Sequence, residues 1–371
     1  MMKSAAKFRL PVIASGSICF FLLIFAFGCG SNPADRKTYA YVLTSQQVGG
    51  SSTGALAQFQ VTTDGELTPL DPPTVSIGTE PVSLAASPDG KYVYALENAL
   101  SQGAYTFTFL RFSINNDGTL APNPVTSTVP SGDYPFTLSP DGRFAFVPWG
   151  NTVTSYRIST SGQFTLASTV SAGSNACTVA IDPTGQFAFV GNYLDYSISE
   201  YKIGADGTLT PTGSISSNPT AVYFLGFSPE GFLYSIGDPY TETLAEYSVD
   251  TTTGTLTELN DLANGQLPFS FAFDRTGAYA YMANTNEGGD SISMFTVDKT
   301  TGTLASSGAD IPTPGAYQIA IDPTGQFVFA LAGGTVWQFK IGSTGTLVSN
   351  GEFPMIAGNG ETSGAIAFAR R

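Results

Sequence analysis

One turn-and-strand motif returns along this chain at nearly even intervals, and it limits the folds that are available. The motif starts with Ser or Asp, continues with Pro, Asp or Thr and Gly, and ends in alternating aromatic and small residues. Clear copies start at Ser87, Ser139, Asp182 and Asp322, and looser copies start at Ser228 and Asp274. Pro presets φ for the first turn position, and Gly takes the positive φ that closes the turn. The alternation after the turn has the period of a strand and not of a helix.

A second motif alternates with the first. An aromatic residue between polar neighbours precedes a turn that ends in Gly, then Thr, Glu or Gln, then Leu or Phe. It occurs seven times, with glycines 43 to 53 residues apart at Gly65, Gly118, Gly162, Gly207, Gly254, Gly302 and Gly345. Apolar segments such as 82–86 and 317–321 precede the first motif and complete a unit of four strands. Repeats of this size are typical of β-propeller blades.

The two ends of the repeat array complement each other. Segment 39–42 opens the array with no strand before it, and segment 364–368 closes it with no turn after it. We therefore predict an all-β, seven-bladed propeller over 38–371, with four antiparallel strands per blade. The C-terminal strand should complete the N-terminal blade, which hides sheet edges. Alternating aromatic residues should pack between blades. A pair of β-sandwiches is the alternative, but it leaves the complementary termini unexplained.

The N-terminal segment predicts export. Three cations within the first nine residues precede an apolar stretch at 18–27, and 26–29 resembles a bacterial lipoprotein box. We expect a signal peptide over 1–28, lipid on Cys29 and a tether over 29–37, which would hold the protein on a membrane, either periplasmic or at the cell surface. An uncleaved membrane anchor over 10–28 is the alternative. Cys177 then has no disulfide partner, and its apolar neighbours predict a small buried side chain.

Composition excludes several kinds of chemistry. The net charge of −14 argues against nucleic acid as a partner. The chain has no histidine, so it contains neither a Ser-His-Asp triad nor a Cys-His pair. Zinc held by ordinary His and Cys ligands is excluded for the same reason, and no acidic segment has the spacing of a calcium loop. We expect no cofactor and no metal.

The repeat resembles the YVTN type, and residues 37–371 are similar to the lactonase family of seven-bladed propellers, which includes 6-phosphogluconolactonases. The resemblance rests on the motif (Ser/Asp)-Pro-(Asp/Thr)-Gly-x-aromatic-x-aromatic. It implies the propeller fold and, in enzymatic members, His, Arg and Glu at the mouth of the central channel. This chain departs from that pattern, because it has no histidine and no arginine that maps to the mouth.

Candidate site residues follow from the repeat. Counting seven residues past each turn glycine predicts a ring at the mouth of the channel, made by Thr44, Glu97, Trp149, Asn192, Asp238, Asn284 and Ala332. Adjacent loops add Asn98, Tyr193, Asp195, Tyr240 and Glu287, and the starts of the first strands add Tyr134, Tyr223 and Tyr317. The Asn and Asp residues have a second possible role in closing turns. Loops on a rigid scaffold are also where binding residues gather.

The predicted mouth contains acids, amides and aromatic residues and no cation. This favours a non-catalytic binding module for a neutral or cationic ligand, a glycan or a protein, and we assign no catalytic residue. The alternative is a lactone hydrolase of the 6-phosphogluconolactonase type, whose chemistry would depend on carboxylates such as Glu97, Asp195 and Asp238.

Overall fold

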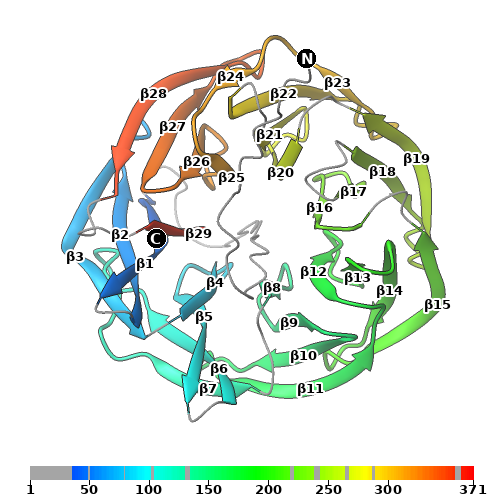
Figure 1. The fold of residues 1–371 in the computed structure, drawn as a ribbon, viewed down its shortest axis with the longest axis horizontal. Helices are drawn as coiled ribbons and strands as arrows, with labels where there is room; N and C mark the ends of the chain where they lie inside the picture. The colour runs from blue at the N-terminus through cyan, green and yellow to red at the C-terminus, as the bar shows by residue number, and fades with distance from the viewer. Residues whose placement is uncertain are drawn as a thin grey trace, which may run out of the picture.

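The computed structural model describes residues 36–48, 51–78, 80–101, 104–129, 134–217, 221–237, 243–263, 267–285, 289–355 and 361–371. Within these ranges the chain forms strands, turns and loops, arranged as seven sheets around a ring (Figure 1). No helix in this part of the chain has the length and apolar character needed to cross a membrane. The predicted seven-bladed β-propeller is confirmed.

The blades are numbered from the N-terminus, and the strands of each blade follow in sheet order. Blade 1 contains β29 (Glu361–Arg370), β1 (Thr38–Val48), β2 (Ser51–Val61) and β3 (Leu67–Gly78). Blade 2 contains β4 (Glu80–Ala86), β5 (Tyr92–Ser101), β6 (Ala104–Ser113) and β7 (Val125–Val129). Blade 3 contains β8 (Thr137–Leu138), β9 (Phe144–Trp149), β10 (Thr152–Ile158) and β11 (Phe164–Ser171).

Blade 4 contains β12 (Ala176–Ile181), β13 (Phe187–Asn192), β14 (Ser197–Ile203) and β15 (Leu209–Ser217). Blade 5 contains β16 (Phe224–Phe227), β17 (Leu233–Ile236), β18 (Thr243–Val249) and β19 (Leu256–Ala263). Blade 6 contains β20 (Leu267–Phe273), β21 (Tyr279–Thr285), β22 (Ser291–Val297) and β23 (Leu304–Ser306), and β24 (Ile311–Pro312) also pairs with β22. Blade 7 contains β25 (Ala316–Ile321), β26 (Phe327–Ala332), β27 (Thr335–Ile341) and β28 (Leu347–Pro354).

The C-terminal strand closes the ring. β29 pairs with β1 in antiparallel register, with Thr38 opposite Arg370. Two further backbone hydrogen bonds continue this pairing, from Lys37 N to Arg371 O at 2.7 Å and from Arg371 N to Lys37 O at 3.0 Å. The first strand of each blade lies nearest the centre in Figure 1 and the fourth lies at the rim. The predicted exchange of strands between the two termini is therefore confirmed.

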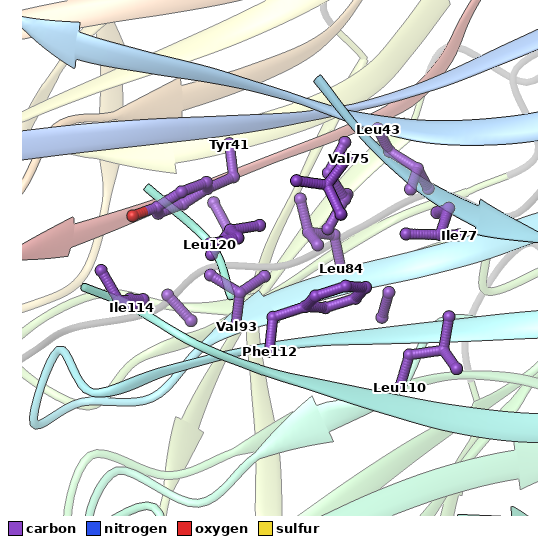
Figure 2. Close-up of a cluster of buried hydrophobic side chains, with 14 of the residues drawn as sticks. Tyr41, Leu43, Val75, Ile77, Leu84, Val93, Leu110, Phe112, Ile114 and Leu120 are labelled. Atoms are coloured by element: carbon purple, nitrogen blue, oxygen red, sulfur yellow. The ribbon is translucent and has the colours of Figure 1, made fainter. Parts of the chain in front are cut away.

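The hydrophobic core lies between neighbouring blades. Figure 2 shows the cluster between blades 1 and 2, where Tyr41 and Leu43 of β1 face Leu84 of β4 and Phe112 of β6. Comparable clusters fill the other interfaces, so both faces of each sheet are covered. This explains the alternating aromatic residues, because each second strand contributes side chains to two interfaces.

The two sequence motifs meet across each interface. In six of the seven blades, the glycine of the second motif lies against the aromatic residue at the start of the second strand in the preceding blade. A Cβ on Gly345 would lie 2.1 Å from the ring of Tyr279. The hydroxyl of Tyr281 donates to the carbonyl of Gly345 at 2.9 Å, and Tyr41 makes the same bond to Gly118 at 2.7 Å. At the remaining interface, the Gly162 turn lies instead against the Arg111 side chain.

Buried polar side chains add a second link between blades. In five blades the residue before the aromatic of the second motif accepts a hydrogen bond from the backbone N–H that follows the next blade's glycine turn: Gln58, Glu200, Glu246, Met294 and Gln338. Gln58 Oε1 accepts from Leu120 N at 2.6 Å, and Gln338 Oε1 accepts from Leu67 N at 3.0 Å. Glu246 Oε1 accepts from Leu304 N at 3.0 Å. These bonds satisfy backbone groups that would otherwise be buried without a partner.

The contact between Gly345 and Tyr279 can be tested against a glycine with open space around it. Gly345→Ala and Gly213→Ala both place a side chain at positive φ, 76° and 87°, which costs about 1–2 kcal/mol. Only Gly345→Ala also meets an aromatic ring, because no heavy atom lies within 4 Å of a Cβ at Gly213. We expect the free energy of unfolding, measured with denaturant, to fall by about 1–3 kcal/mol more in Gly345→Ala than in Gly213→Ala. Equal losses in the two variants would contradict the interlocked interface.

Candidate functional site

The predicted ring residues occupy one level of the propeller. Near the end of each second strand, Glu97 lies opposite Pro81, Asn192 opposite Ala176 and Asn284 opposite Pro268 in the first strand. Thr44, Trp149 and Ala332 hold the corresponding positions in β1, β9 and β26. We call this side of the propeller the mouth face, and the opposite side, with the Pro-x-Gly turns, the turn face.

Blade 5 requires a correction to the count. Its turn is one residue shorter, because Ser228 N donates to Phe232 O, whereas Ser139 N donates to Phe144 O. Tyr234 therefore takes the place that Tyr281 takes in blade 6, with its hydroxyl bonded to Gly302 O. The residue equivalent to Asn192 is consequently Gly237 and not Asp238. Asp238, Tyr240, Glu287 and Cys29 lie outside the described residues.

Asn98 also requires a correction, since it lies in a strand and not in a loop. The β5–β6 hairpin continues beyond it, with Asn98 opposite Phe107 and Ser101 opposite Ala104. The alternating Phe107 and Phe109 side chains are buried and support this longer pairing, and the β1–β2 hairpin of blade 1 is extended to the same degree, with Val48 opposite Ser51.

The two ring asparagines are fully covered. Asn192 and Asn284 both have 0% exposure. Asn192 Nδ2 donates to Ser197 Oγ at 3.0 Å and to Ser199 Oγ at 2.9 Å, and Asn284 Nδ2 donates to Ser293 Oγ at 2.8 Å. The amides therefore tie the ends of the second strands to the third strands.

Aromatic residues form a continuous row on the mouth face. Tyr134, Trp149, Tyr193 and Tyr223 pack together around Cys177. The ring centroid of Trp149 lies 5.6 Å from that of Phe107 and 6.4 Å from that of Tyr134. Toward blade 6, Tyr223 and Phe269 meet edge to face at 6.1 Å. We call these six aromatic residues the aromatic row; the sequence had predicted Tyr134, Trp149, Tyr193 and Tyr223.

Phe107, Cys177 and Phe269 are the members of this region that the sequence reasoning missed as site residues. Cys177 and Phe269 lie five residues before the first residue of the turn motif, as do Tyr134, Tyr223 and Tyr317. At Cys177, Phe269 and Tyr317 the pairing register of the first strand shifts, which marks a β-bulge. This spacing of five residues before the turn motif is the sequence signal that identifies Cys177 and Phe269 as equivalent to the predicted tyrosines. Cys177 is buried, as predicted, and its Sγ donates to Val222 O at 3.2 Å.

Glu97 is a mouth-face carboxyl whose pKa is shifted by its surroundings. Its side chain lies against Gly78 in the connection from blade 1 to blade 2. Burial raises the pKa of the Glu97 carboxyl, because desolvation penalises the charged form. Asp195 differs, since its carboxylate accepts a hydrogen bond from Ser174 N. Glu97 therefore has a perturbed carboxyl on the blade 1 side of β5, whereas Phe107 of the aromatic row packs on the blade 3 side.

Positive charge is confined to the turn face within the described ranges. Three groups account for it: residues in turns (Lys91, Arg143, Arg275 and Lys299), residues at the turn-face ends of third strands (Arg111, Arg157, Lys202 and Lys340), and residues at the β1–β29 junction (Arg36, Lys37, Arg370 and Arg371). The same ranges contain no group of three or more Cys, Asp or Glu arranged to hold a metal ion. The described part of the mouth face therefore contains carboxylates and aromatic residues without an ammonium or guanidinium group.

The family of the chain follows from its sequence as well as its fold. The family model "Lactonase, 7-bladed beta-propeller" matches residues 95–221 and 225–321, which together are more than half of the 371 residues. The chain belongs to this lactonase family of seven-bladed propellers. No curated protein sequence matches it significantly.

Solved structures share the fold over nearly the whole propeller. A candidate 6-phosphogluconolactonase from Bacteroides uniformis superposes with a TM-score of 0.73 at 20% identity, covering 90% of this chain and 100% of that protein. A similar candidate from Bacteroides fragilis gives 0.71 at 19% identity, covering 92% and 100%. The periplasmic gluconolactonase of Pseudomonas aeruginosa gives 0.73 at 15% identity, covering 90% and 99%. At these identities the likeness establishes the fold.

Because the pKa of Glu97 is raised, we expect that replacing this residue stabilises the protein and that the gain depends on pH. The folded protein holds this proton more tightly than the unfolded chain, so Glu97 lowers stability as the pH rises above its ordinary pKa of 4.5. We expect Glu97→Gln to raise Tm at pH 7 and to lose this advantage near pH 4, measured by calorimetry. The exposed Glu66→Gln on the turn face is the control and should leave Tm unchanged at both values. A lower Tm for Glu97→Gln at pH 7 would contradict this account.

Proposed function

We propose that this protein hydrolyses an uncharged sugar lactone at its mouth face, with Glu97 as the general base. The observation that carries the proposal is the half-buried Glu97 carboxyl at the mouth-face level of β5, which lies against Gly78 and whose pKa is raised by desolvation. A carboxylate with a raised pKa is a stronger base than an ordinary carboxylate. Membership of the lactonase family supports the reaction class.

The absence of His and Arg at the mouth had favoured a binding module from sequence alone. General base catalysis needs only one positioned carboxylate. The absence of His and Arg therefore restricts the charge of the substrate more than it restricts the reaction. Phosphorylated and carboxylated ligands are ordinarily held by Arg or Lys. Every described lysine and arginine lies toward the turn face, which supports a substrate without charge. The gluconolactonase of Pseudomonas aeruginosa acts, by its name, on a lactone of this class.

The proposed step needs only water as a second reactant. The Glu97 carboxylate takes a proton from water while the water oxygen forms a bond to the lactone carbonyl carbon. The bond between that carbon and the ring oxygen then breaks. The proton passes from Glu97 to the ring oxygen, which becomes a hydroxyl, and an open-chain hydroxy acid leaves. Glu97 is ionised again at the end.

The proposal is tested by hydrolysis of glucono-1,5-lactone and of its 6-phosphate by the purified full-length protein, with spontaneous hydrolysis subtracted. We expect turnover of the neutral lactone, lower kcat/KM for the phosphate, and a loss of about 10²–10⁴-fold in kcat for Glu97→Gln. The rate should rise with pH through the ionisation of Glu97. Glu66→Gln is the control and should retain the wild-type rate.

Other results would overturn this assignment. Turnover that persists in Glu97→Gln would remove Glu97 from the reaction. Saturable binding of the lactone without turnover, detected by calorimetry, would support a binding module for a neutral ligand or glycan instead. A preference for the phosphorylated lactone would contradict the argument from charge.

We also propose that the protein is an exported lipoprotein anchored through Cys29. The backbone bonds between Lys37 and Arg371 fix the start of the ring at the turn face, so a tether before Arg36 would leave the mouth face directed away from the membrane. We expect Cys29→Ser to lose incorporation of an alkyne-labelled fatty acid and to leave the membrane fraction. Cys177→Ser is the control and should keep both. Fatty-acid labelling that persists in Cys29→Ser would refute the assignment.

A further inference from the structure

Two side chains at the mouth-face end of blade 6 bury oxygen atoms that have no hydrogen-bond partner. Asn284, near the end of β21, is 0% exposed, and Ser291, the first residue of β22, is 7% exposed. Asn284 Oδ1 and Ser291 Oγ are both buried without a partner among the described residues. A buried polar atom without a partner lowers stability, so each such atom needs an explanation.

The two oxygens belong to residues that face each other across neighbouring strands. Asn284 is paired with Ser291 between β21 and β22. Directly opposed residues place their side chains on the same face of a sheet, with Cβ atoms about 4.5–5.5 Å apart. Met282, two residues before Asn284, packs in the cluster between blades 5 and 6, so this face is turned toward blade 5. Two Ca²⁺–O bonds of about 2.3–2.6 Å each span a comparable distance, so one ion can contact both oxygens.

The hydrogen bonds around Asn284 determine which atom of its amide lacks a partner. Asp310, directly before β24 (Figure 1), accepts from Ser293 Oγ at 2.7 Å, and Ser293 Oγ accepts from Asn284 Nδ2 at 2.8 Å. A carboxylate only accepts, so the single hydroxyl proton of Ser293 is used by Asp310. Asn284 Nδ2 also donates to Met282 O at 3.4 Å, and a carbonyl only accepts. The amide therefore has to direct Nδ2 toward these acceptors, which leaves Oδ1 as the atom without a partner.

The charges around the pair favour a positive ligand. Asp310 is joined to Asn284 through Ser293, and the half-buried Asp290 directly precedes Ser291. The described lysines and arginines lie toward the turn face, so none of them supplies a donor to the pair. Two carboxylates without a neighbouring cation give this end of blade 6 a negative potential, which attracts cations.

Blade 4 provides a matched comparison. Asn192 and Ser197 hold the equivalent positions, opposite each other in β13 and β14. In blade 4 the serine is engaged, because Asn192 Nδ2 donates to Ser197 Oγ at 3.0 Å. Only Asn192 Oδ1 lacks a partner there. The opposed pair of unpartnered oxygens therefore distinguishes blade 6 from blade 4, although both contain the same two residue types.

We propose that Asn284 Oδ1 and Ser291 Oγ bind a hard, oxygen-preferring cation, for which Ca²⁺ is the probe. This site goes beyond the hydrolytic function proposed above and does not depend on it. Ca²⁺ accepts amide and carboxylate oxygens and completes its shell with water. Ligands with little charge bind it weakly, with Kd of about 10⁻⁴–10⁻³ M. A buried water is the other group that can join two such oxygens, and the experiments below distinguish it from a cation.

The first test is calorimetric titration of the purified full-length protein with CaCl₂ after treatment with EDTA. We expect saturable binding by the wild type and about tenfold weaker binding by Ser291→Ala. Ser197→Ala is the matched control and should keep the wild-type affinity, because its hydroxyl is already bonded to an amide. A wild type without saturable binding would overturn the cation site and leave a bridging water. Equal affinity in Ser291→Ala and the wild type would overturn the assignment to this pair.

Thermal unfolding gives a second readout on the same variants. Ser291→Ala removes an oxygen that has no partner among the described residues, so we expect it to fold and to keep the wild-type Tm without Ca²⁺. A ligand that binds only the folded state raises Tm, here by about 2–4 °C for the wild type at Ca²⁺ well above Kd. Ser291→Ala should show no such rise. A rise of the same size in Ser291→Ala would contradict the proposal.

A charged variant reverses the expected direction of the effect. Asn284→Asp adds a buried negative charge, so we expect a lower Tm without Ca²⁺, about tenfold tighter Ca²⁺ binding and a larger rise in Tm when Ca²⁺ is added. Asn192→Asp buries a charge at the equivalent position of blade 4 and should lower Tm without this recovery. Equal recovery of the two variants, or none in Asn284→Asp, would refute the cation site.

Discussion

The contact between a turn glycine and an aromatic ring of the preceding blade is the interaction on which the ring depends. A propeller has no core shared by all blades, so each interface must fix the distance and angle to the next. Gly118 lies against Tyr39 and Gly345 against Tyr279, and tyrosine hydroxyls bond to the carbonyls of both glycines. Gln338 and Leu67 repeat the buried polar link across the closure between blade 7 and blade 1. The interface between blades 7 and 1 keeps the glycine–aromatic contact, with Gly65 against Phe327, and the paired β1 and β29 strands hold blade 1 together.

In this construction the tight turns lie on one face of the ring and the candidate site lies on the other. The tight turns and the described cations gather on the turn face, where Asp89 pairs with Lys91 at 2.9 Å and Asp141 with Arg143 at 2.6 Å. Such exposed pairs add little to stability. Their location nevertheless leaves the described mouth face without positive charge, which selects against anionic ligands before any specific contact is made.

The mouth face combines covered and accessible elements. The Nδ2 groups of Asn192 and Asn284 donate to serines that hold strand ends together, while the Oδ1 atoms of both side chains are buried without a partner among the described residues. Glu97 is half-buried and Tyr196 is exposed, and both carry a physical cost: a desolvated carboxyl at Glu97 and positive φ at Tyr196. Costs of this kind are typical of sites kept for function. The rigid ring tolerates them because its stability comes from the blade interfaces.

The sequence by itself determined the number of blades, their strand order and the exchange of strands between the termini, because the turn glycines and alternating aromatics repeat with a fixed spacing. It also placed Glu97, Trp149 and Asn192 at one level of the ring. Only the tertiary structure decided which of these side chains stay accessible. Asn192 lies beneath the backbone at Gly173, in the connection between blades 3 and 4, a contact that no local pattern encodes. The shorter turn in blade 5 moved the equivalent position from Asp238 to Gly237, since the aromatic contacts to Gly302 and not the residue count set the register. The strain at Asn175 and Tyr196 likewise depends on hydrogen bonds between two loops, which exist only once blades 3 and 4 are packed together.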